Sequence, residues 1–119
     1  MFDARRAEDA VAHYLEARGF EILARNLKLG HLEVDIVALR DGLAAMVEVR
    51  TRGRTAFEGP FASIAGKKKM RLLYAADRLW RGHLAKMPGV ERMRIDVAGV
   101  TFDEDGDAHV EYVSGAITA

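Results

Sequence analysis

The sequence predicts a single α/β domain in which helices flank a mixed β-sheet, with elements in the order α-β-β-β-α-β-β. The 119 residues suffice for one domain with its own core, and no linker or repeat divides residues 1–119. Apolar residues follow helical spacing in two segments and strand-like runs in five. One hairpin joins adjacent strands in antiparallel fashion, so an all-parallel, doubly wound sheet is excluded.

The first helix and strand are bounded by turn-forming residues. Asp3 can cap a helix that runs to about Arg18, and Gly19 supplies a stop at its end. A strand from Phe20 to about Leu27 follows. The apolar stripe of the helix consists of Ala4, Ala7, Val11, Tyr14 and Leu15.

Two β-rich runs, 32–39 and 43–50, lie on either side of Asp41-Gly42. Asp-Gly between such runs is a strong hairpin signal, because both positions tolerate the positive φ of a tight turn. This hairpin is the element that the sequence predicts most directly.

The second half of the chain reads as a loop, a long helix and two strands. Residues 51–62 contain two glycines and a proline and should form an exposed loop. Ser63 can cap a helix ending near Gly82, with an apolar face formed by Ile64, Leu72, Leu73, Ala76, Leu79 and Trp80. Strands are expected at 92–100 and 110–113, joined by the polar turn 103–107.

The composition limits the classes of function. There are no cysteines, which excludes a disulfide scaffold, a thiol nucleophile and cysteine-based zinc sites. The N-terminus shows neither a signal peptide nor a membrane-spanning run, so we expect a cytoplasmic protein without a membrane partner. No phosphate-binding glycine loop or serine-hydrolase elbow is present, and the four histidines lack metal-ligand spacing.

The formal net charge is zero, but the charges are unevenly distributed. A basic segment in the middle of the chain contains Arg50, Arg52, Arg54, Lys67, Lys68, Lys69 and Arg71, against the single acid Glu58. This segment could bind nucleic acid, or its lysines could simply be the solvated first turns of a helix.

The predicted hairpin brings two carboxylates together. If residues 41 and 42 form the turn, residues whose numbers add to 83 face each other, so Asp35 faces Glu48 and Val37 faces Met46. Like charges placed opposite each other are destabilising. Either one carboxylate keeps a proton through a raised pKa, or a cation such as Mg²⁺ lies between them.

Further ionisable residues accompany this pair. Glu33 and Arg50 should also face each other, on one face of the hairpin with Asp35 and Glu48, while Val34, Ile36, Val47 and Val49 cover the other face. Glu8 lies at the edge of the first helix's apolar stripe and points toward the sheet or snorkels to solvent. Asp96 interrupts an apolar strand, either as a site residue or as a partner of Arg94 or Arg50.

The chain resembles the YraN family of uncharacterised bacterial proteins over nearly its whole length. The residues that carry the resemblance are Ala7-Glu8, Tyr14-Leu15, 19–23, Arg25-Asn26, 33–37, 47–52, Lys68, Arg71, Ala75-Ala76 and 94–97. That family is regarded as an endonuclease group similar to archaeal Holliday junction resolvases and to the PD-(D/E)XK superfamily. The resemblance therefore implies a restriction-endonuclease-like fold.

The resemblance also implies roles for individual residues. Asp35 would be the first metal-binding carboxylate, Glu48 the acid of the (D/E)-X-K triplet, and Glu8 the acid supplied by the helix. Glu33 would be a further acid beside the metal, which in such enzymes is Mg²⁺ or Mn²⁺. We therefore expect a magnesium-dependent endonuclease acting on branched or structured DNA, and, by analogy with resolvases, a homodimer.

Two departures from the family pattern affect the expected catalysis. Arg50 replaces the lysine of the triplet, and a guanidinium can stabilise phosphate but cannot act as a base. Leu32 replaces a glycine. A lysine such as Lys68 of the long helix could supply the lost amine, and the alternative is a module of the same fold that binds nucleic acid without cutting it. A protein-interaction domain, a third alternative, has only the zero net charge in its favour.

Overall fold

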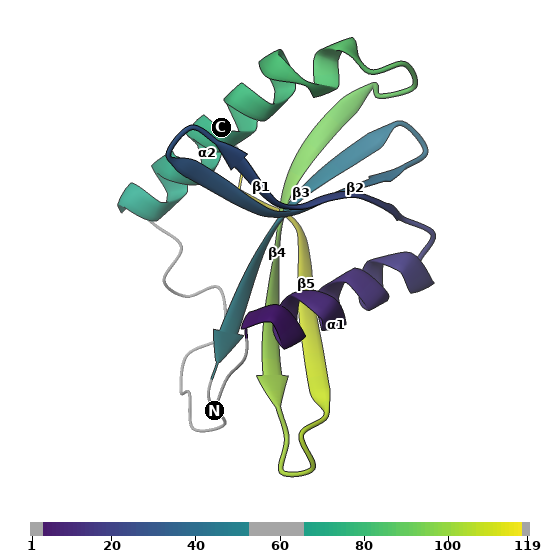
Figure 1. Cartoon of the computed structure of the whole chain (residues 1–119), viewed down its shortest axis with the longest axis vertical. Helices are drawn as coiled ribbons and strands as arrows, with labels where there is room; N and C mark the ends of the chain where they lie inside the picture. Colours follow the sequence, from purple (N-terminus) through teal and green to yellow (C-terminus); the bar gives the residue numbers. More distant parts are fainter. Residues whose placement is uncertain (1–3, 53–65, 118–119) are drawn as a thin grey trace.

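The computed structural model describes residues 4–52 and 66–117 of the chain. Two helices lie on opposite faces of a five-stranded sheet (Figure 1). The helical elements are α1 (Ala4–Ala17), α2 (Gly66–Gly82) and a short 3-10 turn, η1 (Leu84–Lys86). The strands are β1 (Glu21–Leu29), β2 (Leu32–Arg40), β3 (Leu43–Arg52), β4 (Arg92–Phe102) and β5 (Ala108–Ile117).

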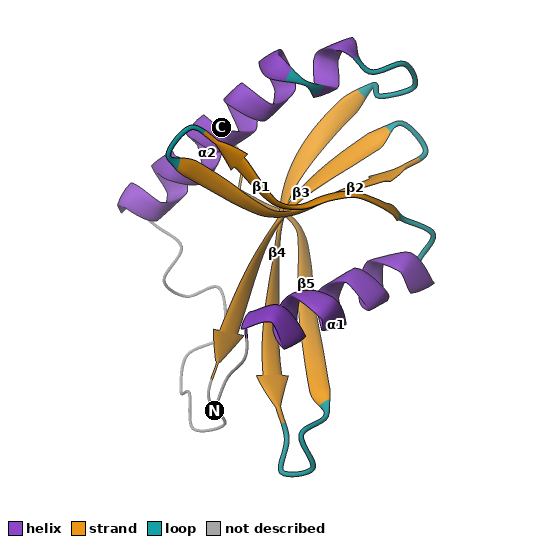
Figure 2. Cartoon of the chain, viewed as in Figure 1, coloured by secondary structure: helices purple, strands orange, loops and turns teal. Residues whose placement is uncertain are grey.

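The sheet is mixed, and its strands follow the chain order β1-β2-β3-β4-β5. Only β3 and β4 pair in parallel, and α2 lies in the connection between them; the other neighbouring pairs are antiparallel. Figure 2 shows the strands fanning out from a common centre, as they do in a strongly twisted sheet. The predicted fold class and element order are thus confirmed.

The predicted stops and turns are present. Phe20 N donates to Leu15 O at 3.0 Å and Gly19 has φ +87°, which ends α1 where the sequence indicated. Asp41 and Gly42 both have positive φ, +50° and +79°, as the predicted two-residue hairpin requires. The expected caps Asp3 and Ser63, together with Ile64, lie outside the described residues.

Several strand boundaries differ from the prediction. β1 ends at Leu29 and β4 at Phe102, each two residues beyond the predicted end. β3 continues through Arg52, so residues 51 and 52, expected in a loop, belong to the strand, and positions 53–62 lie outside the described residues. β5 covers Ala108–Ile117 rather than 110–113. It pairs with a single neighbour, so its exposed positions can be polar, as Glu111 and Ser114 are, and no continuous apolar run marks its length.

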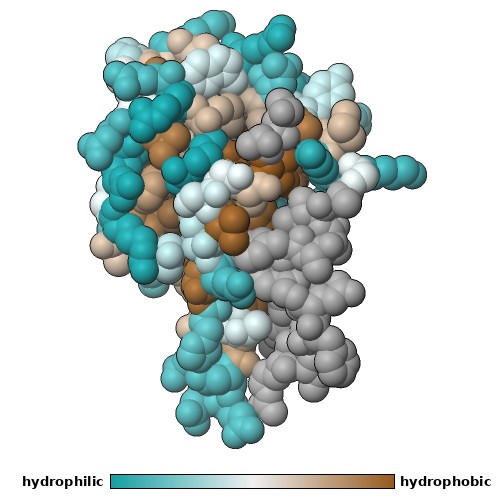
Figure 3. Space-filling model, turned by 180° about the vertical axis from the view of Figure 1, so that it is seen from behind, coloured by the Kyte–Doolittle hydropathy of each residue, from teal (hydrophilic) through white to brown (hydrophobic). Residues whose placement is uncertain are grey.

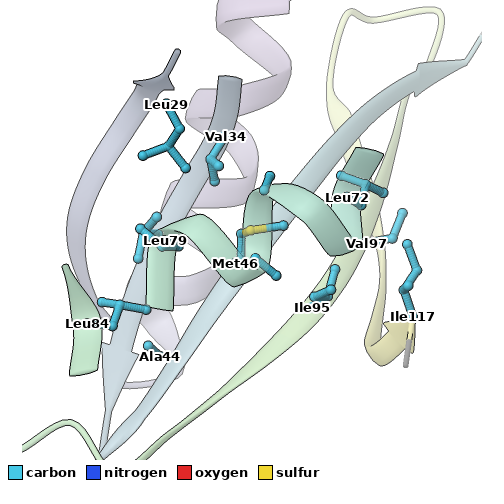
Figure 4. Close-up of a cluster of buried hydrophobic side chains, with 13 residues drawn as sticks. Leu29, Val34, Ala44, Met46, Leu72, Leu79, Leu84, Ile95, Val97 and Ile117 are labelled. Carbon is cyan, nitrogen blue, oxygen red and sulfur yellow. The ribbon is translucent and has the colours of Figure 1, made fainter. Parts of the chain in front are cut away.

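The core consists of two apolar layers, one on each face of the sheet. Under α2, Leu72 and Leu79 pack over Met46, Ile95 and Val97 (Figure 4). Under α1, the second layer is formed by Ala7, Val11, Leu15, Phe20, Ile36, Val47 and Val100, among others. Neither α1 nor α2 combines the length and the apolar content needed to cross a membrane.

Val34 corrects the predicted assignment of faces. It packs with Leu29 and Leu79 in the layer under α2, not with Ile36 under α1 (Figure 4). Side chains alternate strictly between the two faces only where a strand pairs regularly with both of its neighbours. Near Val34, β2 no longer pairs regularly with β3. Its pairing with β3 ends at Ile36, and Asn26 in the neighbouring β1 has φ +53°.

Candidate functional site

A cleft of about 600 Å³ opens between the first half of β2, the second half of β3 and the first turns of α2. Its lining residues include five of the predicted site residues, Glu33, Asp35, Glu48, Lys68 and Arg71. The lining comprises His31, Leu32, Glu33, Asp35, Glu48, Val49, Lys68, Arg71, Leu72 and Ala75. The structure therefore brings the carboxylates of the hairpin to one concave surface, together with a lysine and an arginine from α2.

Asp35 lies where the pairing of β2 with β3 stops. The last pair is Ile36 with Val47, and one step further Val49 N donates to Asp35 Oδ2 at 2.8 Å. The side chain thus takes an amide that a regular ladder would offer to the backbone, which explains why the strands separate here. The predicted register is confirmed from Ile36 to Arg40, but the expected direct pairs Asp35–Glu48 and Glu33–Arg50 lie beyond it.

The Asp35 carboxyl is half-buried, and its pKa is raised to about 7. Burial is the largest cause, and the negative charges of Glu48 and Glu8, with a hydrogen bond to Glu48, raise it further. The hydrogen bond from Val49 opposes the shift. The raised pKa agrees with the first of the two explanations offered by the sequence, in which one carboxyl of the pair binds a proton more tightly than usual.

Glu48 is buried, with 9% of its surface exposed, and it is paired with a lysine from the other side of the cleft. Lys68 Nζ lies 2.5 Å from Glu48 Oε2. The α2 helix positions this amine, because Leu72 and Ala75, on the same helix face one and two turns later, are buried against the sheet. The sequence had named Lys68 as a lysine that could supply an amine to this site, and the structure places its ammonium group beside Glu48.

Glu8 approaches the same acids from α1. Its side chain is 13% exposed, Asn26 Nδ2 donates to its Oε1 at 3.1 Å, and the Arg25 guanidinium lies 3.6 Å away. Glu8 also contributes to the raised pKa of Asp35, which places its charge close to that carboxyl. Of the alternatives left open by the sequence, the helix acid points toward the sheet.

Asn26 is a residue whose importance the sequence did not reveal. It occupies the left-handed region at φ +53° in the middle of β1, a conformation that is costly for a side-chain-bearing residue. Its amide holds Glu8. The signal available in the sequence was an asparagine within a strand, since asparagine is the residue other than glycine that best tolerates positive φ.

Glu33 and Arg50 lie at the margin of the site. Glu33 pairs with Lys28 across β1 and β2 at 3.3 Å, and 45% of its side chain is exposed at the rim of the cleft. Glu33 thus forms a cross-strand ion pair with a residue of β1. Arg50 lies on β3 opposite Gly99, half-buried, and among the described residues it is not part of the cleft lining.

The predicted nucleic-acid contacts are divided among three places. Lys68 and Arg71 line the cleft, and Lys67 and Lys69 are exposed on the same turns of α2. Arg52 is the last residue of β3, and Arg54 falls outside the described residues. The basic character of the surface beside the cleft therefore comes mainly from α2.

Asp96 is a structural residue. Its side chain is fully buried and accepts two hydrogen bonds from Arg94, at 2.7 and 2.9 Å. Tyr112 Oη and Gly115 N also donate to it, at 2.6 and 2.8 Å. These four hydrogen bonds explain the acid in an apolar strand and connect β4 to β5. The sequence had named Arg94 as one of two partners and had missed Tyr112.

The cleft offers a suitable donor set for a small hard cation. Asp35 and Glu48 line it and carry carboxylate oxygens, which Mg²⁺ and Mn²⁺ prefer, and Glu8 approaches from α1 outside the lining. Among the described residues, these three acids do not form a group whose carboxylate oxygens all lie within 4.8 Å of one another. In the described part of the chain, three acids with ligand atoms within 4.8 Å of one another occur in the β4–β5 turn, at Asp103, Asp105 and Asp107.

That turn has a structural explanation. Asp103 accepts hydrogen bonds from the backbone amides of Asp105 and Asp107, both at 2.9 Å, and contacts the His109 ring at 2.8 Å. The carboxylate closes its own turn, as aspartate commonly does.

The chain is a single α/β domain with a five-stranded mixed sheet, and a solved structure has a similar fold. The structure of SfsA from Pyrococcus furiosus, determined in complex with Ca²⁺, superposes with a TM-score of 0.55 and 14% sequence identity. The match covers 100% of this chain and 67% of that one. At this identity the likeness concerns the fold alone.

The chain belongs to the uncharacterised protein family UPF0102, whose model matches residues 7–100. A UPF0102 protein from Sorangium cellulosum is 49% identical over 112 residues, covering 93% of this chain and 77% of the relative. One from Arthrobacter is 37% identical over 111 residues, covering 93% and 92%. The YraN-like family that the motifs predicted is thereby confirmed.

Proposed function

We propose that this protein is a metal-dependent nuclease that hydrolyses phosphodiester bonds in branched or otherwise structured DNA. The observation that carries the proposal is the half-buried Asp35 beside buried Glu48, in a cleft whose opposite wall presents Lys68. Burying two carboxylates side by side costs folding free energy, so such a pair is usually kept because it has a function, such as binding a metal ion. A fold of the restriction-endonuclease-like class supports the assignment.

In this proposal Asp35, Glu48 and Glu8 hold Mg²⁺ or Mn²⁺, and Glu33 completes the acidic rim. The bound metal supplies an activated water and offsets the charge that develops on the phosphate. Lys68 orients Glu48 and presents its ammonium group to the cleft, where it stabilises a phosphate oxygen. Arg71 and, from outside the lining, Arg50 bind neighbouring phosphates, because guanidinium groups remain charged and match phosphate geometry.

The direct test is cleavage of labelled four-way junction and flap DNA in Mg²⁺ or Mn²⁺ by wild type and Asp35→Asn. We expect the wild type to cut and the variant to lose at least about 100-fold in rate, because a neutral amide is a poor metal ligand. Glu16→Gln, an exposed acid of α1 outside the cleft, is the matched control and should cut normally. Equal cleavage by wild type and Asp35→Asn would remove the site assignment.

A second candidate function is a module of the same fold that binds nucleic acid without turnover. Arg50, in the place of the catalytic lysine of similar proteins, favours it, as does the basic exposed side of α2. This alternative predicts binding that weakens steeply with salt, together with no cleavage by the wild type in either metal. A homodimer remains an expectation from the resemblance, to be checked by sedimentation.

A further inference from the structure

The outer side of α2 exposes two large apolar side chains, Met70 and Tyr74. They are 64% and 67% exposed, and they are the large hydrophobic residues most open to solvent in the described chain. Four residues apart on a helix, they lie next to each other on one face. Neither contributes to the core under α2, so their exposure points to a role at the surface.

The surroundings of this pair are strongly basic. Helix α2 contains six lysines and arginines and one acid, Asp77, which is itself bound to Arg81 at 2.9 Å. Arg71 precedes Tyr74 by three residues and Arg78 follows it by four, so a basic residue lies on each side of Tyr74 on this face of the helix, and the Arg78 guanidinium extends toward Gly30. An exposed aromatic ring within a row of cations is typical of surfaces that bind single-stranded nucleic acid.

Arg71 connects this surface to the cleft. It lines the cleft that contains Asp35 and Glu48, and it also lines the surface depression formed by Met70, Leu73 and Tyr74. Arg71 therefore lies between the acids of the cleft and Tyr74 on one helix. Figure 3, which views the molecule from behind, shows apolar residues in brown reaching the surface among hydrophilic ones in teal.

We propose that Tyr74, supported by Met70, is a stacking platform for an unpaired base of a DNA strand whose phosphates lie on Arg71 and its neighbours in α2. The inference rests on the proposed function and deepens it, because it assigns the unpaired part of a branched substrate to a defined surface beside the cleft. Self-association through this face is disfavoured, because it would bring two strongly basic helices together. Stacking on tyrosine accepts any base, which suits an enzyme that recognises structure rather than sequence.

The test compares two single strands of about 12 nucleotides, one of oligo(dT) and one of the same length without bases, by fluorescence anisotropy in EDTA. Wild type should bind the base-containing strand about 5- to 100-fold more tightly, as expected for one stacked base. Tyr74→Leu keeps an apolar side chain of helix-forming character but no ring, and should lose this preference. Tyr74→Phe should retain it.

Salt titration separates stacking from phosphate contacts. Tyr74→Leu should keep the wild-type salt slope, whereas Arg71→Ala should reduce the slope by about one while leaving the preference for bases unchanged. Because Tyr74 is exposed, both tyrosine variants should keep the wild-type circular dichroism spectrum and melting temperature.

Three results would overturn the platform. The first is equal binding of the two strands by wild type, and the second is an unchanged preference for the base-containing strand in Tyr74→Leu. The third is a change of sedimentation coefficient in Tyr74→Leu, which would make the surface a contact between two copies of the chain. Metal-free binding does not depend on catalysis. The proposed nuclease is judged separately, by cleavage with Asp35→Asn, so failure of the platform and failure of the nuclease are distinguishable.

Discussion

Lys68 Nζ lies 2.5 Å from Glu48 Oε2, so α2 places an ammonium group beside a buried carboxylate of β3. A lysine carried on a neighbouring helix can reach the same carboxylate as one carried two residues along the strand. What matters for the chemistry is the position of the amine relative to the acid, not its position in the sequence.

Replacing Lys68 should impair both the site and the fold. Lys68→Met removes the charge and leaves Glu48 buried beside apolar side chains, which should lower the free energy of unfolding by about 1–3 kcal/mol at pH 8. If the proposed function holds, DNA cleavage should fall by about 100-fold or more. Denaturant titration and cleavage rates measure the two effects. Arg50→Met is the comparison, and a larger loss of cleavage there would give Arg50 the role assigned to Lys68.

The sequence predicted the elements and most of the hairpin because local signals determine them. The Asp41-Gly42 turn sets the register, and that register is correct from Arg40 back to Ile36. It fails at Asp35 because the side chain there takes the Val49 amide, a tertiary contact without a local signature. The pairing of Lys68 with Glu48 depends on how α2 crosses the sheet, which spacing along the chain does not specify.

Asp35 should make the protein less stable as the pH rises, when no metal is present. The pKa of Asp35 is about 7 in the folded state and near 3.8 in the unfolded chain. Between pH 3.8 and pH 7 the folded state therefore binds this proton more tightly than the unfolded state does. This contribution is fully present below about pH 4 and is lost as the pH rises through 7. Asp35→Asn stays neutral and keeps an acceptor for Val49 N. It should therefore be more stable than wild type at pH 8, by about 1–3 kcal/mol after allowance for solvent screening, and equal at pH 4.

Urea titrations in EDTA at pH 4, 6 and 8 would measure this difference, with Glu16→Gln as a control for the loss of one exposed acid. A constant difference between Asp35→Asn and wild type across this range would contradict the raised pKa. A stabilised variant without cleavage would identify Asp35 as a residue retained for function at the expense of stability.

Tyr112→Phe tests the structural assignment of Asp96. The substitution removes the 2.6 Å hydrogen bond to a fully buried carboxylate while keeping the ring that stacks on Tyr14. We expect a loss of about 1–3 kcal/mol in the free energy of unfolding, because one oxygen of a buried acid loses a donor. Metal affinity, measured by calorimetry, should remain that of wild type. A large drop in metal affinity would instead connect the Asp96 cluster to the cleft.

Asn26 allows stability and site organisation to be separated in one pair of variants. Asn26→Gly relieves the cost of φ +53° but removes the 3.1 Å hydrogen bond to Glu8, so the protein should unfold at an equal or higher denaturant concentration while Glu8 loses its support. Asn26→Ala removes the same hydrogen bond and keeps the strain, so it should be less stable than Asn26→Gly by about 1 kcal/mol.

If Glu8 belongs to the metal site, both variants should bind Mn²⁺ about 10- to 100-fold more weakly than wild type, despite their different stabilities. Calorimetric titration of Mn²⁺ into the two variants, with denaturant unfolding in parallel, decides the matter: wild-type affinity in Asn26→Gly would show that the asparagine serves the strand and not the acid.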